Sequence, residues 1–134
     1  MHAHLASGLT APAHLALSAG VLSWTSSWMQ THGLELDLVT LGGGMGVDYA
    51  DPENRFDWLS FGTGLADLAD RHPGVTLRIE PGRALTAYAG WYVAEVLDVR
   101  PSHGQWFAVL SGGTHHLRTP AARGHDQPFT VVAN

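Results

Sequence analysis

Two spacings of apolar residues divide the first half of the chain into predicted helices and strands. Thr10 and Pro12 are typical of a helix start, and Gly33 is typical of a helix end. Between them, apolar residues recur at helical spacing, and we expect the tryptophans to pack in a core or an interface: Leu17, Val21, Trp24 and Trp28. The pattern predicts one long helix in this part of the chain.

Strands and a second helix alternate further along the chain. We expect a strand at residues 34–41, a polar loop at 48–55, a helix at 57–71 and a buried strand at 75–79. The second helix has its apolar residues at helical spacing: Trp58, Phe61, Leu65 and Leu68. Strands that alternate with helices predict a parallel α/β sheet with the helices outside it.

The last third of the chain has a different pattern. Residues 91–100 and 105–110 predict two strands, and the Pro-Ser-His-Gly between them is a turn signal. Because no helix intervenes, these strands should pair antiparallel, and residues 129–132 predict one more strand. We therefore expect an α/β part at residues 1–90 and the start of an all-β part at 91–134.

Composition narrows the classes of function. The 134 residues fit one modest domain, and 45% apolar residues suffice for a core. A net charge of −5 argues against a nucleic-acid partner, and no apolar run is long enough for a membrane span. The absence of cysteine excludes disulfides and thiol nucleophiles and fits a cytoplasmic protein. The chain also has no lysine, so it cannot by itself complete a mechanism that needs a lysine amine.

The stretch richest in chemistry is Arg78-Ile-Glu-Pro-Gly-Arg83, which ends the predicted strand at 75–79. The carboxyl ends of strands are where α/β folds place their sites. Glu80 can accept a hydrogen bond from a ring nitrogen, and Gly82 lets backbone approach a ligand closely. Arg83 can bind a phosphate or carboxylate through two parallel hydrogen bonds. The simpler interpretation of this stretch is a turn with a salt bridge.

Two further candidates lie upstream. Gly42, Gly43 and Gly44 follow a predicted strand, and their amides could hold a phosphate. The pattern is neither a P-loop nor a dinucleotide fingerprint, so a plain glycine turn is the alternative. His4 belongs to a His-x-His pair and could pack or titrate at a strand end. Its alternative is a surface histidine in a frayed terminus.

The tail of the chain holds the last candidates. Arg118 could bind a substrate carboxylate, or it could be an exposed loop arginine. His115 and His116 could bind a metal, but adjacent residues on a strand point to opposite faces. We therefore expect no metal site at this pair.

Three motifs taken together resemble one enzyme family. His4-Leu-Ala-Ser-Gly8, Leu41-Gly-Gly-Gly44 and Glu80-Pro-Gly-Arg83 have the order and spacing of the middle of the fold-type III, pyridoxal-phosphate-dependent decarboxylases, which include the ornithine and diaminopimelate decarboxylases. The sequence around Gly-Gly-Thr-His-His-Leu-Arg-Thr-Pro is most similar to the branch of this family that takes part in siderophore biosynthesis. The resemblance implies part of an alanine-racemase-like (β/α)8 barrel followed by the first strands of a β domain.

The resemblance also implies a role for each matched residue. His4 would lie flat on one face of the ring of pyridoxal 5′-phosphate, and Glu80 would pair with the pyridine nitrogen. Arg118 and His116 would contact the substrate. The remaining matched residues would hold the cofactor phosphate: Ser7, Gly42, Gly43, Gly44, Gly82 and Arg83.

The chain departs from the family in what it lacks. The Schiff-base lysine of the family lies upstream of the matched motifs, and a catalytic cysteine given by the partner subunit of a dimer lies downstream. A complete barrel needs about 250 residues. We therefore expect a central fragment of a homodimeric decarboxylase that acts on an amino acid or an amino-acid conjugate. We expect the fragment alone to be inactive.

Two other classes of function stay open. One is a metal-dependent hydrolase on a barrel, because a His-x-His pair at a strand end is a feature of such sites. The other is a non-catalytic truncated module, which the missing lysine favours. A partial barrel exposes strand edges and apolar faces, so we also expect poor solubility or self-association.

Overall fold

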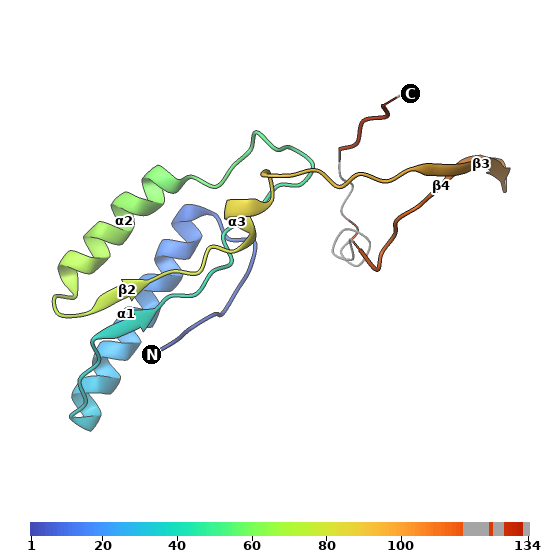
Figure 1. The fold of residues 1–134 in the computed structure, drawn as a ribbon. Coiled ribbons are helices and arrows are strands. Elements are labelled where there is room, and N and C mark those ends of the chain that lie inside the picture. The colour runs from blue at the N-terminus through green and yellow to red at the C-terminus, as the bar shows by residue number, and fades with distance from the viewer. Residues whose placement is uncertain (117–123, 125–127, 133–134) are drawn as a thin grey trace. The chain divides into compact units, whose positions relative to one another are not determined.

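The computed structural model describes residues 1–116, 124 and 128–132. The chain divides into two compact units, the first formed by Met1–Asp48 with Glu53–Tyr88 and the second by Tyr49–Pro52 with Ala89–Asn134. The helices and strands are drawn in Figure 1: α1 (Ala11–His32), β1 (Leu38–Thr40), α2 (Trp58–Arg71), β2 (Thr76–Arg78), α3 (Arg83–Thr86), β3 (Val96–Ser102) and β4 (Gln105–Leu110).

A parallel sheet forms the centre of the first unit. β1 pairs in parallel with β2, with Val39 opposite Leu77. On the other side of β1, the N-terminal segment joins the sheet through a parallel bridge between His2 and Thr40. The expected parallel α/β arrangement is therefore confirmed. β1 starts later than predicted because the amide of Leu34 donates to the Met29 carbonyl and so belongs to the end of α1.

Both long helices begin and end at capping residues. The Thr10 side chain accepts a hydrogen bond from the Ala13 amide at the start of α1, and Gly33 ends it in the left-handed conformation. Asp57 caps α2 by accepting bonds from the hydroxyl and the amide of Ser60. These bonds, the hydroxyl bond first, hold the pKa of Asp57 below its usual value. The predicted helix starts are confirmed.

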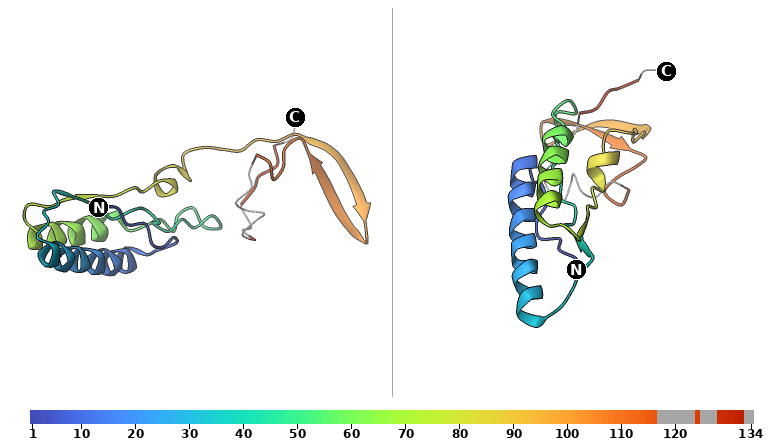
Figure 2. Two further views of the ribbon diagram at one scale, coloured as in Figure 1. Left: turned by 90° about the horizontal axis from the view of Figure 1, so that it is seen from below. Right: turned by 90° about the vertical axis from the view of Figure 1, so that its left-hand side faces the viewer.

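The core of the first unit lies between the helices and the sheet. Both views of Figure 2 show α1 and α2 side by side on one face of the strands. The buried apolar residues of this layer are Ala3, Val21, Leu22, Val39, Leu41 and Leu68. The helices approach closely at Gly64, where an added Cβ would collide with the Leu15 side chain.

The buried face of α1 differs from the predicted one. Trp24 and Trp28 stack on each other with ring centroids 6.0 Å apart, and both are exposed. The buried side carries Val21, as predicted, together with the polar residues His14, Ser18 and Thr25. Their hydrogen bonds within the helix and to the glycine loop make this burial possible, because a buried polar group needs a partner.

Residues 75–79 contain the predicted strand, β2, but the strand is not buried as expected. Exposure alternates along the segment: Val75, Leu77 and Ile79 are half-buried, whereas Thr76 and Arg78 are exposed. The helices cover one face of the sheet in the part of the chain that the structure describes (Figure 1), so every second side chain of this strand faces away from the core.

The second unit contains an antiparallel hairpin, as predicted. β3 pairs with β4, and the turn passes through His103 and Gly104 with φ angles of 51° and 78°. β3 begins at Val96 rather than at residue 91, and residues 128–132 form no strand where one was expected at 129–132. No helix in the described ranges is both long and apolar enough to cross a membrane.

Candidate functional site

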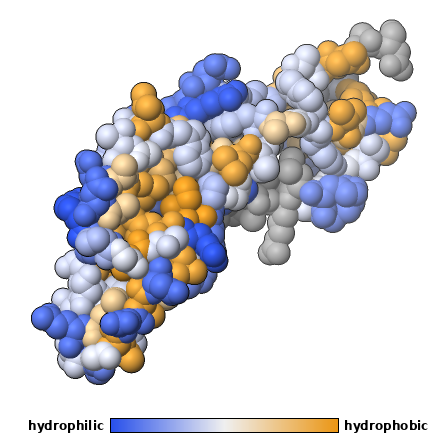
Figure 3. Space-filling model, turned by 60° about the vertical axis from the view of Figure 1, so that its left-hand side comes forward, coloured by the Kyte–Doolittle hydropathy of each residue, from blue (hydrophilic) through white to orange (hydrophobic). Residues whose placement is uncertain are grey.

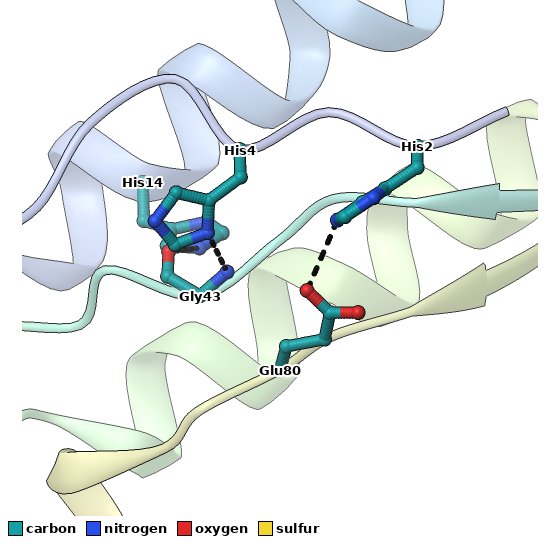
Figure 4. Close-up of polar contacts among 5 residues, drawn as sticks. All are labelled: His2, His4, His14, Gly43 and Glu80. Atoms are coloured by element: carbon teal, nitrogen blue, oxygen red, sulfur yellow. Dashed lines mark hydrogen bonds and ion pairs between the residues drawn. The ribbon is translucent and has the colours of Figure 1, made fainter.

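Polar side chains occupy the face of the sheet that the helices leave uncovered. Val39 and Leu77 pack toward the helices, so their neighbours Thr40 and Arg78 lie on the opposite side of β1 and β2. One step further along, at the carboxyl ends of the strands, the chain places His4, the glycine loop and Glu80 next to one another (Figure 4). This edge of the sheet is the candidate site.

The glycine loop is hydrogen-bonded to both of its neighbours. The Gly43 amide donates to Nδ1 of His4 at 3.2 Å. The Gly42 carbonyl accepts from the Glu80 amide at 2.8 Å. Three segments that are far apart in the sequence therefore meet here, which the motif pattern predicted. The alternative of a histidine in a frayed terminus does not describe His4.

Only glycine fits this loop. A Cβ added to Gly42, Gly43 or Gly44 would collide with the backbone carbonyl oxygen of Ala3, Glu80 or Ala6, respectively. Gly42 and Gly44 also have φ angles of 73° and 85°, which side chains disfavour. The loop is thus more than a plain turn, because its backbone is packed against the strands on both sides.

Glu80 has a partner that the sequence pattern did not indicate. Nε2 of His2 lies 3.1 Å from Oε2 of Glu80, and the two side chains are 59% and 48% exposed. Figure 4 shows the two side chains pointing at each other across the sheet. The contact uses one carboxylate oxygen of Glu80, so the other oxygen, Oε1, can accept a hydrogen bond from a ligand.

The remaining candidates of the first unit lie around the glycine loop. The Cα atom of Ser7 is 3.2 Å from the position of a Cβ on Gly44. Gly82 precedes α3 with a φ of 50°, and Arg83 is the first residue of that helix. The next residue, Ala84, packs against a second buried cluster, formed by Ala11, Met45 and Phe61, and Met45 follows Gly44 by one position.

The substrate candidates of the tail belong to the second unit or lie outside the described residues. Arg118 is one of the latter. His116 lies beside Tyr92, whose hydroxyl is 3.4 Å from the histidine Nδ1. The expectation that His115 and His116 point to opposite faces of a strand was wrong. They lie in a turn, and their ring centroids are 3.9 Å apart.

Sequence reasoning missed two contributors to the site. His14 is completely buried and reaches the Gly43 carbonyl from α1. A hydroxyl four residues later, on Ser18, was the available signal, because residues i and i+4 share a helix face. Tyr88 ties down the loop after the glycines: its hydroxyl accepts from the Asp48 amide and donates to the Asp48 carbonyl, at 3.0 Å each.

The donor set of the site fits a phosphorylated ring. The glycine loop is packed so closely that its residues have no room for a side chain. Within the described residues, the Gly44 amide donates no hydrogen bond. Such amides suit an anion, an imidazole suits a ring face, and a carboxylate suits a protonated ring nitrogen. The His, Asp and Glu side chains of the described ranges form no metal-binding group of three or more.

The chain is similar in sequence to known proteins. A family described as "Pyridoxal-dependent decarboxylase, pyridoxal binding domain" matches residues 1–87. A Staphylococcus aureus protein, 2-[(L-alanin-3-ylcarbamoyl)methyl]-2-hydroxybutanedioate decarboxylase, is 41% identical over 107 residues, which cover 78% of this chain and 27% of that protein. Diaminopimelate decarboxylase of Escherichia coli K12 is 30% identical over 138 residues, 99% of this chain and 32% of that enzyme.

A solved structure agrees with these relatives. Diaminopimelate decarboxylase from Helicobacter pylori, complexed with L-lysine, superposes with a TM-score of 0.74 at 24% identity, over 95% of this chain and 31% of that one. The chain thus spans about a quarter to a third of the length of the relatives it matches. The expected fold, part of an α/β barrel, is confirmed.

Proposed function

This chain belongs to the family of pyridoxal-dependent decarboxylases, and we propose that its first 90 residues hold pyridoxal 5′-phosphate for the decarboxylation of an amino acid or an amino-acid conjugate. The chain has no lysine. The amine that the family uses must therefore come from residues outside this sequence, and we expect no turnover by these 134 residues alone.

Each residue of the site has a distinct task in this proposal. When bound, the cofactor supplies an electron-withdrawing ring that stabilises the charge left by the departing carboxylate. Glu80 holds a proton at the ring nitrogen, since a carboxylate beside that nitrogen favours its charged form. His4 would hold the ring by contact with one face. His2 keeps the Glu80 carboxylate in place through Oε2.

The phosphate is bound by backbone amides and one guanidinium. The amides of Gly42, Gly44 and Gly82 would donate to the phosphate oxygens, together with the Ser7 hydroxyl and the Arg83 side chain. Gly43, whose amide donates to His4, would line the same loop. Each charge-assisted hydrogen bond of this kind contributes about 1.5–3 kcal/mol. These segments would hold the phosphate at the edge of the sheet that also carries His4 and Glu80.

The proposed substrate class follows from the Staphylococcus aureus relative. Its name describes an alanine unit linked through its third carbon, by an amide, to a hydroxybutanedioate. We assign this chain a related amino-acid conjugate in siderophore biosynthesis, with Arg118 and His116 as contacts for a substrate carboxylate. The assignment of residues 91–134 to a β domain, the homodimer and the cytoplasmic location stay predictions.

The observation that carries the proposal is the meeting of His4, Gly43 and Glu80 at one edge of the sheet. A metal-dependent hydrolase has no comparable support, because the described residues offer no ligand group. A non-catalytic module remains compatible with the missing lysine, and cofactor binding by the chain is what separates it from our proposal.

The test uses absorption spectra of the purified chain titrated with pyridoxal 5′-phosphate. We expect saturable binding and a bound-ring band that changes in Glu80→Gln, which removes the carboxylate at the ring nitrogen. Glu35→Gln is the matched control, since it makes the same chemical change at an exposed residue outside the site. Absence of saturable binding, or release of carbon dioxide from an amino-acid substrate by the chain alone, would contradict the proposal.

A further inference from the structure

One buried histidine has no role in the proposed binding of the cofactor. His14 lies in the first turns of α1 and has 0% exposure. Its ring meets the edge of Phe61, with centroids 4.8 Å apart. A polar ring in such a place needs partners for both nitrogens, because an unpaired buried donor or acceptor is costly.

Both ring nitrogens of His14 are paired, and the partners fix its tautomer. Nε2 lies 3.0 Å from the Gly43 carbonyl oxygen, and Nδ1 lies 3.1 Å from the Ser18 hydroxyl. A carbonyl oxygen only accepts, so Nε2 carries the proton and donates it. In the neutral ring, Nδ1 then accepts from the hydroxyl of Ser18, which is itself buried.

The bond to His14 determines the direction of a neighbouring amide. The Gly43 carbonyl and the Gly44 N–H belong to the same peptide unit, which is trans, so they point in opposite directions. With the carbonyl held toward the interior by His14, the Gly44 N–H points to the opposite side, away from α1. Gly42 and Gly44 flank this region with positive φ angles. Within the described residues, the bond to His14 is the one hydrogen bond that this peptide unit makes, so it fixes the rotation of the unit.

The same residue is also connected to the ring-binding side of the site. The Gly43 amide belongs to the preceding peptide and donates to Nδ1 of His4. Gly43 is therefore held by one histidine at its carbonyl and by another at its amide, as Figure 4 shows. A shift of one peptide would displace the other, because the two units share the Gly43 Cα.

We propose that His14 is a positioning residue: its Nε2–H bond to the Gly43 carbonyl sets the Gly43–Gly44 peptide so that the Gly44 amide faces a bound phosphate. His14 touches neither ligand nor reacting atoms and acts only through the loop. The inference rests on the proposed role of the glycine loop in holding pyridoxal 5′-phosphate, and it adds a residue of α1 to that site.

Three variants separate positioning from filling of the core. His14→Phe keeps a ring in the cavity and removes both bonds, whereas His14→Gln keeps an amide that can donate to Gly43. Ser18→Ala removes only the bond at Nδ1. We expect pyridoxal 5′-phosphate to bind about tenfold more weakly to the Phe variant, because that variant loses the hydrogen bond to the Gly43 carbonyl and leaves this carbonyl unpaired. Binding to the Gln and Ala variants should stay within about threefold of the parent chain.

Nuclear magnetic resonance of the chain without cofactor gives an independent readout. Long-range proton–nitrogen spectra should show His14 protonated at Nε2 only, and the Gly44 amide signal should move on addition of inorganic phosphate in the parent chain and in His14→Gln. In His14→Phe that movement should be much smaller.

The outcomes distinguish the two proposals. Protonation at Nδ1 of His14 overturns the positioning role whether or not the cofactor binds. Equal binding by the parent chain and a folded His14→Phe overturns it as well, as does failure of a folded His14→Gln to recover binding. If the parent chain binds no cofactor while His14 has the expected tautomer and the Gly44 signal responds to phosphate, the proposed function fails and the positioning role stands. If neither cofactor nor phosphate has an effect, both fail.

Discussion

Gly43 is the residue at which the segments of the site meet, so its substitution should be costly. A Cβ in Gly43→Ala would collide with the Glu80 carbonyl oxygen, which is backbone and cannot turn aside like a flexible side chain. We expect a loss of about 1–3 kcal/mol in the free energy of unfolding, together with weaker binding of pyridoxal 5′-phosphate. Denaturant unfolding and a cofactor titration measure the two effects.

Gly74→Ala is a useful comparison for Gly43→Ala. Gly74 has a φ of 87°, but a methyl group added there would have open space around it, since nothing lies within 4 Å of that position. The variant should lose stability through backbone strain alone and keep its affinity for the cofactor. Unchanged stability and affinity in Gly43→Ala would contradict the tight packing of the loop.

The sequence predicted the residues of the site better than their contacts. The three glycines and Glu80 were identifiable because glycine and charged residues directly after strands are a local signal. The bond between His14 and Gly43 joins residues 29 positions apart, and that between His2 and Glu80 joins residues 78 apart. Such pairs depend on how the strands and α1 pack, which spacing along the chain does not encode.

At the scale of a single helix, α2 contains two glycines with opposite environments. A Cβ at Gly62 meets nothing within 4 Å, whereas one at Gly64 collides with the Leu15 side chain of α1. Gly62→Ala should stabilise the chain by about 0.5–1 kcal/mol, because alanine is the better helix former. In Gly64→Ala the same gain is partly or fully offset, because the Leu15 side chain must move to make room for the added methyl group.

Thermal unfolding of the two variants, compared side by side, measures this difference. Both variants replace a glycine of α2 by alanine, so they differ mainly in whether the added methyl group meets Leu15. Equal stabilisation by the two substitutions would show that α1 and α2 do not approach closely at Gly64. In a Leu15→Ala background, Gly64→Ala should cost less than it does in the parent chain, because the colliding atoms are absent there.

The helices also show which sequence signals were sufficient. Thr10 and Gly33 cap α1 as predicted, and Asp57 caps α2 at the predicted start of that helix. Such caps can be predicted because capping depends on a few adjacent residues. The buried face of α1 was not predictable from apolar spacing, since Trp24 is exposed and His14 is buried. Polar residues that find partners in a core escape any pattern that counts only apolar side chains.

For the molecule as a whole, the alternation of elements predicted the parallel sheet and the hairpin, and the resemblance of three motifs predicted the family. The solvent exposure of individual side chains was harder to predict, because it depends on which elements pack against each face of a helix or strand. β3 and β4 are exposed along almost their entire length within the described residues. A two-stranded sheet on its own is only marginally stable in water.

The exposed apolar side chains favour self-association of the chain. Large apolar side chains lie open to solvent in both units: Leu59 is 83% exposed in the first and Trp91 is 95% exposed in the second. Figure 3 shows apolar side chains gathered on one face of the first unit. Contiguous apolar surface of this kind favours contacts between copies of a chain. We therefore expect the average mass in sedimentation to rise with protein concentration.

A variant can separate this association from a defect in folding. Leu59→Gln changes an exposed position of α2, so the free energy of unfolding should stay within about 0.5 kcal/mol of the parent value. Association should weaken, because a polar side chain replaces apolar surface that copies of the chain would otherwise bury. A chain that stays monomeric at every concentration and unfolds in one sharp transition would show that these apolar surfaces drive no association.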